Sequence, residues 1–140
     1  MSGQIKFKYQ DVSFRLKEVN RHRVFVHSVM AGEKTGFSEV IYIFCDDVYL
    51  HKLNIQYLNH DTYTDILTFN LSLPSQPIIS EIYISVDRVK ENALNLKEPF
   101  HRELLRVMIH GLLHLVGYGD HSQQEKRIMR QKEDHYLNLY

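Results

Sequence analysis

Three histidines lie in one short segment, HGLLHLVGYGDH, which runs from His110 to His121 with His114 between them. Four residues of α-helix turn the chain through about 400°, so His110 and His114 face the same way, one turn apart. Gly117 and Gly119 can then end the helix and fold the chain back, because glycine adopts positive φ without a steric penalty. This turn would return His121 towards the first two histidines. The spacing therefore predicts a metal site.

Three neutral imidazoles suit Zn²⁺ in a catalytic rather than a structural site. Zinc in proteins is usually four-coordinate, so three protein ligands leave one position open for water or substrate. The alternative is that His110 and His114 are core histidines bonded to the backbone, and the third histidine after two glycines favours the metal over it. We therefore expect His110 and His114 to act in catalysis, and His110, His114 and His121 to hold the ion.

The residue after the first histidine argues against the mechanism of the common zinc peptidases. In their HExxH helix, a glutamate at that place activates the metal-bound water. This chain has Gly111 there, so a zinc peptidase is the least favoured function. A glycine inside a helix costs about 1 kcal/mol relative to alanine, which indicates either close backbone packing or room for a substrate beside the metal.

Composition indicates one globular domain over residues 1–140. The chain is 44% hydrophobic and 24% charged, and its 17 basic residues balance its 17 acidic ones. Any basic surface for a nucleic acid must therefore be local. The single cysteine, Cys45, lies in the apolar run VIYIFC and is expected in the core, which fits a reducing compartment. No stretch has the roughly 18 apolar residues of a membrane span, and the N-terminal segment lacks the apolar region of a signal peptide. The sequence therefore predicts a cytoplasmic protein without a membrane partner.

Hydrophobic patterning predicts four strands and five helices. The strands are expected at residues 4–9, 39–45, 66–71 and 81–85. The helices are expected from an N-cap at Ser13 to Gly32, from a cap at Asp46 to about Asn59, over residues 86–96, from Pro99 through the histidines, and from a capping box at Ser122 and Glu125 to Leu139.

The order of these elements predicts an α+β fold. A long helix between the first two strands implies a crossover and a parallel pair, whereas the short connection between the last two favours antiparallel pairing. The helix that carries the histidines is apolar nearly all round and should be buried. We thus expect a single domain with a mixed four-stranded sheet, about five helices, and the metal site on a buried helix.

Two blocks of this sequence resemble the YbeY family, bacterial ribosomal RNA maturation factors described as metal-dependent endoribonucleases. The family signature HGxLHLxGYDH is similar to HGLLHLVGYGDH, and LNxxYRxxDxPTDVLSF is similar to LNIQYLNHDTYTDILTF at residues 53–69. The family's GDIxIS also resembles SEIYIS at residues 80–85. The resemblance covers essentially the whole chain. It implies an RNA substrate, Zn²⁺ as cofactor, and His110, His114 and His121 as the metal ligands.

Two positions depart from the family pattern. Gly119 lengthens the segment before His121 by one residue, which makes Asp120 an alternative ligand or a partner of a ligand. Leu58 replaces an arginine that is implicated in RNA cleavage, and leucine cannot hold a phosphate. Either another cation substitutes, with Lys52 and Arg88 as candidates, or the nuclease activity is weaker.

The leading hypothesis is a zinc-dependent endoribonuclease that cuts single-stranded precursor ribosomal RNA in 3′-end maturation and ribosome quality control. His60, Thr64 and Thr68 are candidates to approach the substrate, although both threonines also suit a strand. The alternative hypothesis is a ribosome-assembly binding factor with a structural zinc and little nuclease activity. Its partners would include a ribosomal protein or a ribosome-associated GTPase.

Overall fold

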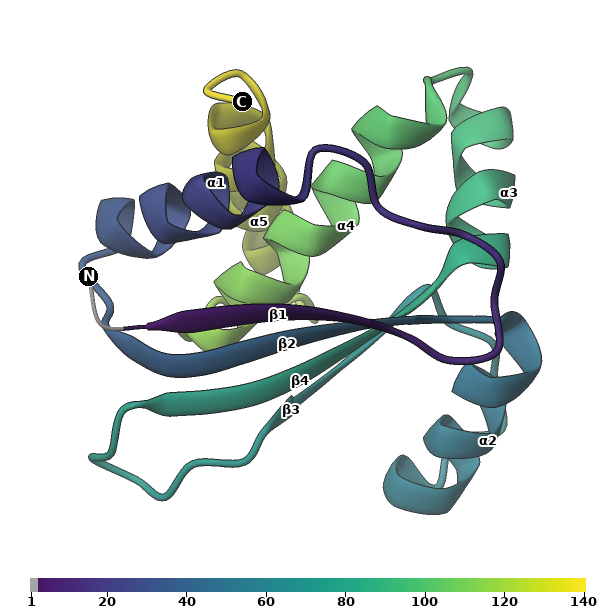
Figure 1. Ribbon diagram of the computed structural model, residues 1–140, viewed down its shortest axis with the longest axis horizontal. Helices are drawn as coiled ribbons and strands as arrows, with labels where there is room; N and C mark the ends of the chain where they lie inside the picture. The colour runs from purple at the N-terminus through teal and green to yellow at the C-terminus, as the bar shows by residue number, and fades with distance from the viewer. Residues whose placement is uncertain (1–2) are drawn as a thin grey trace.

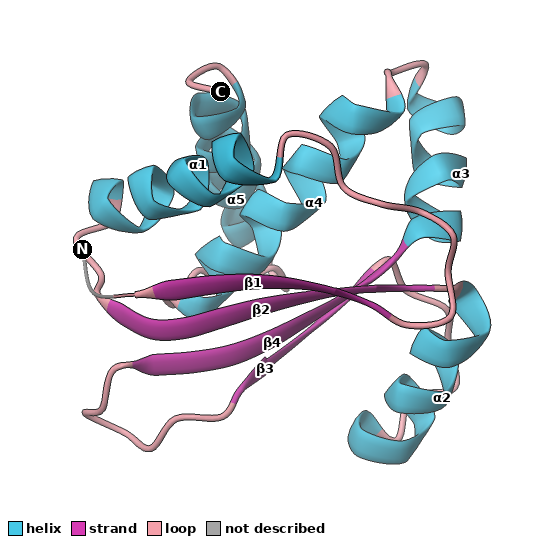
Figure 2. Cartoon of the chain, in the orientation of Figure 1, coloured by secondary structure: helices cyan, strands magenta, loops and turns pink. Residues whose placement is uncertain are grey.

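The computed structural model describes residues 3–140 and has a four-stranded sheet with helices on both faces (Figures 1 and 2). The described residues form five helices, as expected. In chain order the elements are β1 (Gln4–Tyr9), α1 (Val19–Gly32), β2 (Phe37–Cys45), α2 (Asp47–Leu58), β3 (Ile66–Asn70), β4 (Ile78–Ser85), α3 (Val86–Leu96), α4 (Phe100–Leu115) and α5 (Gln123–Leu137).

The sheet is mixed and has the strand order β1-β2-β4-β3. β2 pairs in parallel with both β1 and β4, whereas β3 pairs antiparallel with β4. The predicted fold class is confirmed, including the parallel first pair and the antiparallel last pair. β3 lies at the edge of the sheet, and this edge borders the histidine helix.

The α4 helix lies across one face of the sheet and forms the centre of the core (Figure 1). The Tyr42 hydroxyl of β2 donates a buried 3.0 Å hydrogen bond to the Met108 carbonyl of α4. A Cβ atom at Gly111 would lie 3.0 Å from Ile66 Cδ1 and 3.1 Å from Ile82 Cγ2. The glycine therefore allows close packing of the helix on the sheet, which is the first of the two explanations that the sequence left open.

A smaller apolar cluster lies on the opposite face of the sheet, where Leu50 of α2 packs with Cys45 of β2 and Leu67 of β3. Cys45 is buried, as expected, and burial raises the pKa of its thiol to about 12, with the nearby aspartates adding to the shift. The thiol is thus a small apolar group in the packing of α2 against the sheet.

The predicted start of the first helix was wrong. Ser13 does not cap it, and the helix begins at Val19 after Glu18, whose φ of 53° lies in the left-handed region. The segment before it is held by tertiary contacts: the Leu16 amide donates to the Tyr9 hydroxyl over 3.1 Å, and Phe14 packs against Phe44 with ring centroids 5.2 Å apart. These contacts bury Leu16 without a helix.

Other predicted boundaries were nearer to the structure. Asp46 caps α2 by accepting from the Tyr49 amide over 2.8 Å, and Ser122 and Glu125 form the expected capping box of α5. Strand β2 begins at Phe37 and strand β4 at Ile78, both earlier than expected, because their pairing extends beyond the apolar runs of the sequence.

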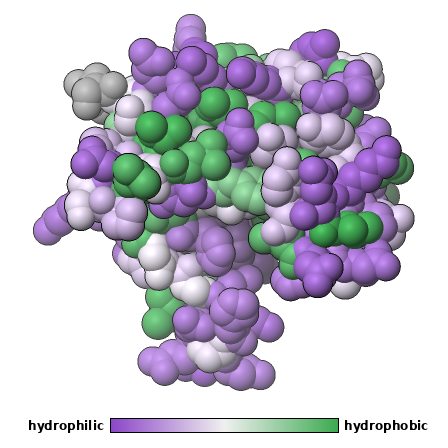
Figure 3. Space-filling model, turned by 90° about the horizontal axis from the view of Figure 1, so that it is seen from below, coloured by the Kyte–Doolittle hydropathy of each residue, from purple (hydrophilic) through white to green (hydrophobic). Residues whose placement is uncertain are grey.

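No helix among the described residues is long and apolar enough to cross a membrane. The face seen in Figure 3 mixes polar surface with separate apolar groups. The large exposed apolar side chains include Val48, Ile55, Tyr57, Leu71 and Leu73.

Glu33, at the end of α1, joins three elements through one buried carboxylate. Its side chain is 6% exposed and accepts hydrogen bonds from Tyr118 over 2.7 Å, from Lys132 over 3.2 Å, and from Tyr136. Burial alone would raise the pKa of Glu33, but these donors outweigh burial and lower it. The carboxylate thereby fixes α1 against α5 and the turn after α4.

Replacing Glu33 with alanine should lower the free energy of unfolding by about 2–3 kcal/mol, because hydrogen bonds to a buried charge are lost and two hydroxyls are left without an acceptor. Because the pKa of Glu33 is depressed in the folded state, its contribution is present above the unfolded value of about 4.3. That contribution disappears as the pH falls through the folded pKa. Urea unfolding at neutral and acidic pH measures both effects.

Glu91 offers a matched control, since its carboxylate is 58% exposed and lies 3.4 Å from Arg88. Glu91→Ala should change stability by less than about 1 kcal/mol, as for other exposed ion pairs. Equal losses in Glu33→Ala and Glu91→Ala would contradict the structural role of Glu33.

Candidate metal centre and active-site cavity

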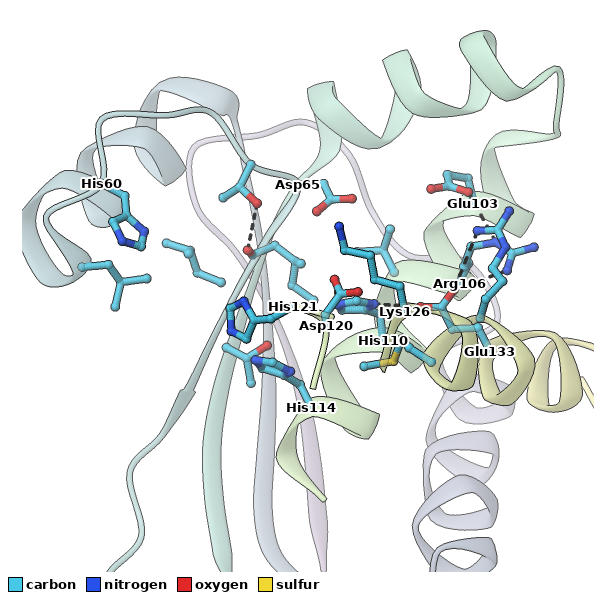
Figure 4. A pocket seen from close by; sticks show the side chains of 18 residues that line it. His60, Asp65, Glu103, Arg106, His110, His114, Asp120, His121, Lys126 and Glu133 are labelled. Carbon is cyan, nitrogen blue, oxygen red and sulfur yellow. Dashed lines mark hydrogen bonds and ion pairs between the residues drawn. The ribbon is translucent and has the colours of Figure 1, made fainter. Parts of the chain in front are cut away.

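A cavity of about 830 Å³ opens between β3, α4, α5 and the segment that joins α2 to β3 (Figure 4). The side chains of His110, His114 and His121 all line it. The same cavity is also lined by residues of the second sequence block, among them Leu58, His60, Thr64 and Thr68. The fold thus brings together the two parts of the chain that the sequence marked as functional.

His110 is anchored from the side of α5. Its Nδ1 lies 2.7 Å from Glu133 Oε2, and its Nε2 lies 3.7 Å from Asp120 Oδ2. Burial alone would lower the pKa of His110, but the hydrogen bond to Glu133 and the charges of Glu133, Asp120 and Asp65 outweigh burial and raise it. The carboxylate of Glu133 orients the ring and leaves Nε2 on the side of the cavity.

His114 is anchored by its own turn. Its Nδ1 donates to the Tyr118 carbonyl over 3.0 Å, and because a carbonyl only accepts, Nε2 is the nitrogen with a free lone pair. The rings of His110 and His114 are 6.1 Å apart and inclined by 21°. The two side chains therefore share one face of α4, as their spacing predicted.

The turn after α4 delivers His121 to the same cavity. Gly117 adopts a φ of 110°, as expected for a glycine that ends a helix, and His121 follows with its side chain exposed. The His121 amide donates to Glu125 Oε1 over 3.1 Å. Figure 4 shows His121 near His114 and Asp120 among the side chains that line the cavity.

The donor set fits a zinc ion by its chemistry. Two imidazoles have Nδ1 engaged by a carboxylate or a carbonyl, which is how metal-binding histidines are usually held, and the third lines the same cavity. Within residues 3–140, no three side chains of the histidine, cysteine, aspartate or glutamate type are gathered closely enough to form a metal cluster. The role of His110, His114 and His121 as ligands thus stays a prediction.

Gly119 has a defined place in this turn. A Cβ atom there would overlap Glu125 Oε2, so the glycine makes room for the carboxylate that completes the capping box of α5. Glu125 in turn accepts from the amides of His121 and Ser122. The additional residue before His121 is accommodated because the carboxylate of Glu125 holds the lengthened turn.

We expect Gly119→Ala to displace the Glu125 carboxylate and lower stability by about 1 kcal/mol, the usual value of a helix cap. The turn that carries His121 should loosen at the same time and weaken zinc binding. Isothermal titration with zinc and thermal unfolding measure the two effects. Gly36→Ala is the control, because nothing lies within 4 Å of a Cβ atom there.

Sequence reasoning missed the charged residues behind the histidines. Arg106 lines the cavity with its side chain 8% exposed, 2.8 Å from Asp134 and 3.4 Å from Glu133. Its Nε is 3.7 Å from Glu103. The sequence could have indicated this buried ion pair, because Glu103 and Arg106 occupy adjacent turns of a helix that is otherwise apolar, and buried charges are found in pairs.

Asp65 also went unnoticed, although it lies inside the second sequence block. Its carboxylate lines the cavity and accepts from Asn92 Nδ2 over 3.1 Å. Burial raises the pKa of Asp65 above its ordinary value. Asp65 therefore adds a carboxylate to the wall of the cavity.

The two cations named as substitutes for the family arginine do not line the cavity. Lys52 lies on the exposed side of α2, and Arg88 forms an ion pair of 2.6 Å with Asp47. The cations that do line it are Arg106, Lys126 and Arg130.

The chain is similar to known proteins over nearly its whole length. The family model of Endoribonuclease YbeY matches residues 4–140. Endoribonuclease YbeY of Flavobacterium psychrophilum is 48% identical over 136 residues, covering 97% of this chain and 96% of the relative. The protein of the same name from Christiangramia forsetii is 40% identical over 138 residues, covering 99% and 95%.

A solved structure is also similar. A Thermotoga maritima protein, determined in solution, superposes with a TM-score of 0.68 at 28% identity, covering 96% of this chain and 87% of that one. Together with the fold and the histidine-lined cavity, these matches define an enzyme of the hydrolase class. The chain belongs to the Endoribonuclease YbeY family. The resemblance seen in the sequence blocks is confirmed.

Proposed function

We propose that the chain, as one domain over residues 1–140, is a zinc-dependent endoribonuclease for single-stranded precursor ribosomal RNA. Its role is 3′-end maturation and ribosome quality control in the cytoplasm, a reducing compartment that suits the single buried thiol of Cys45. The observation that carries the proposal is the cavity lined by His110, His114 and His121, with two rings anchored through Nδ1.

The residues of the chain have distinct roles in this proposal. The Nε2 atoms of His110 and His114, with the imidazole of His121, would hold zinc, while Glu133 and the Tyr118 carbonyl keep the first two rings in place. When bound, zinc supplies a Lewis acid that polarises a phosphoryl oxygen and favours deprotonation of water near neutral pH. Asp120, whose Oδ2 lies 3.7 Å from His110 Nε2, can accept a proton at that oxygen.

The dimensions of the cavity suit a nucleotide. Its volume of about 830 Å³ lies within the usual range of about 300–1,000 Å³ for sites that bind small molecules. A single strand can place one phosphate and its neighbouring riboses in such a space, whereas a duplex keeps its phosphates on a wide rigid cylinder. The cavity therefore supports a preference for unpaired RNA.

The test is cleavage of precursor ribosomal RNA and of an unstructured RNA by zinc-loaded protein, with His110→Ala prepared in parallel. The proposal expects cleavage by the wild type, inhibition by chelators, and loss of cleavage in the variant. Equal cleavage by both proteins would show a contaminating nuclease and would sink the proposal.

A second candidate function keeps the fold and the metal without the chemistry. The wall of the cavity has Leu58 where the family pattern has an arginine, and the whole chain has no net charge. These observations favour a ribosome-assembly binding factor with a structural zinc, with a ribosomal protein or a ribosome-associated GTPase as partner. Absence of cleavage by both proteins, together with wild-type binding to precursor RNA, would support it.

A further inference from the structure

The side chains that line the cavity carry no net positive charge, so a substrate phosphate needs a protein cation in addition to the zinc ion of the proposed function. Four carboxylates line it, from Asp65, Glu103, Asp120 and Glu133, against the three cations of Arg106, Lys126 and Arg130. A phosphodiester placed among these groups meets repulsion unless a free positive charge faces it. Which of the three cations is free therefore decides how a phosphate can bind.

Two of the three cations are engaged by carboxylates. Arg106 is buried between Glu133 and Asp134, at 3.4 Å and 2.8 Å. Arg130 Nη1 lies 3.9 Å from the same Glu133 carboxylate, so part of its charge is compensated. The charge of Arg106 is therefore compensated, and that of Arg130 is compensated in part.

Lys126 differs from both. It lies in the first turns of α5, is exposed, and lines the cavity. Among residues 3–140, no carboxylate forms an ion pair with its amine. Figure 4 shows its side chain extending into the cavity on the side of His110 and Asp120.

Leu58 lies on a different wall of the same cavity, at the end of α2. It is 44% exposed and offers only methyl groups to the space in which the family pattern has a guanidinium. A lysine acts on a phosphate as a point charge on a flexible stem, so it can serve from another wall than the one that carries the arginine.

We propose that Lys126 is the phosphate-binding cation of this chain and replaces, from α5, the arginine that the family pattern has at position 58. The inference rests on the proposed function, because it assigns the contact for the RNA backbone in that same cavity. Lys126 contributes positive charge to RNA binding and does not position the three histidines.

The experiment measures binding of the zinc-loaded protein to a fluorescent single-stranded 2′-O-methyl RNA, by anisotropy over a range of salt concentrations. One phosphate contact to a single strand contributes about 0.7 to the slope of log affinity against log salt. Lys126→Gln should lower that slope by about this amount and weaken binding about fivefold at low salt. Lys126→Arg should retain both.

Two further variants make the test specific. Lys52→Gln removes the same charge from an exposed position outside the cavity and should bind like the wild type. Leu58→Arg added to Lys126→Gln should restore most of the affinity, because it returns a cation to the family position. This restoration is a result that a general loss of positive charge would not give.

The outcomes separate the two proposals. If the wild type binds RNA and Lys126→Gln matches Lys52→Gln in slope and affinity, the role of Lys126 is overturned while the proposed function stands. If the wild type shows no salt-dependent binding at all, the proposed function fails and this inference fails with it. A smaller slope in Lys126→Gln, restored by Leu58→Arg, supports the assignment.

Discussion

Replacing His114 with alanine should reduce the zinc content of the purified protein from one equivalent to almost none and abolish RNA cleavage. His114 lies on the cavity with Nδ1 bonded to the Tyr118 carbonyl, so alanine removes an oriented donor and no core packing. Loss of a residue that only supports a metal ligand costs about 10–100-fold in affinity or activity, and loss of a ligand should exceed that. Metal analysis and the RNA assay measure the two effects.

His101 is the matched control for this substitution. It is an exposed histidine on the same helix and does not line the cavity. His101→Ala should keep full zinc content, activity and stability. One equivalent of zinc in His114→Ala would show that the ligands have been assigned wrongly.

The third ligand can be settled by a pair of variants. His121 and Asp120 both line the cavity, and Asp120 Oδ2 lies 3.7 Å from His110 Nε2. If His121 is the third ligand, His121→Ala should lose zinc almost completely and Asp120→Asn should weaken binding only modestly. The reverse order would make Asp120 the ligand.

Local sequence determined the parts of the fold that depend on local physics. The pairing of β1 with β2 followed from the length of the helix between them, and the cap at Ser122 from a hydroxyl and a glutamate at the right spacing. The start of α1 did not follow. Glu18 takes a left-handed conformation, and the Leu16 amide is bonded to the Tyr9 hydroxyl. The spacing of apolar residues indicates neither of these features.

In the candidate site too, the features set by local sequence could be predicted and those set by tertiary packing could not. The common face of His110 and His114 was predictable because both lie on one helix. The cations of the cavity were not, because Lys126 and Arg130 have the spacing of an ordinary solvent-exposed helix face. Only the packing of α5 against α4 shows that this face borders the histidines.

Removing a buried charge from the wall of the cavity is expected to cause the largest loss of stability. Arg106 interacts with Glu133 and Asp134, and its Nε and Glu103 Oε1 have no hydrogen-bond partner among the described residues. Removing the arginine leaves the buried Glu103 carboxylate without its ion-pair partner and takes one cationic partner from Glu133, whose shortest contact is with His110. Arg106→Met should therefore lower the free energy of unfolding by about 3–5 kcal/mol, the usual cost of breaking a buried ion pair.

The pH dependence of this loss has a definite sign. Burial already raises the pKa of Glu103, and Arg106 counteracts that shift, so its removal raises the pKa further. A carboxyl whose pKa is higher in the folded than in the unfolded state destabilises the protein above that pKa, and the penalty disappears as the pH falls and both states become protonated. Urea unfolding of Arg106→Met should thus show a smaller deficit at acidic than at neutral pH.

Arg102 and a compound variant separate stability from function. Arg102→Met removes a partly exposed arginine 3.4 Å from Glu98 and should cost less than about 1 kcal/mol.

Replacing Glu103, Arg106 and Glu133 together by leucine, methionine and leucine should recover much of the stability, because a packed apolar cluster avoids the desolvation of buried charges. The same triple variant should bind zinc more weakly than the wild type, because His110 Nδ1 has lost the carboxylate that orients its ring. Recovery of both stability and zinc affinity would show that the charges serve folding alone.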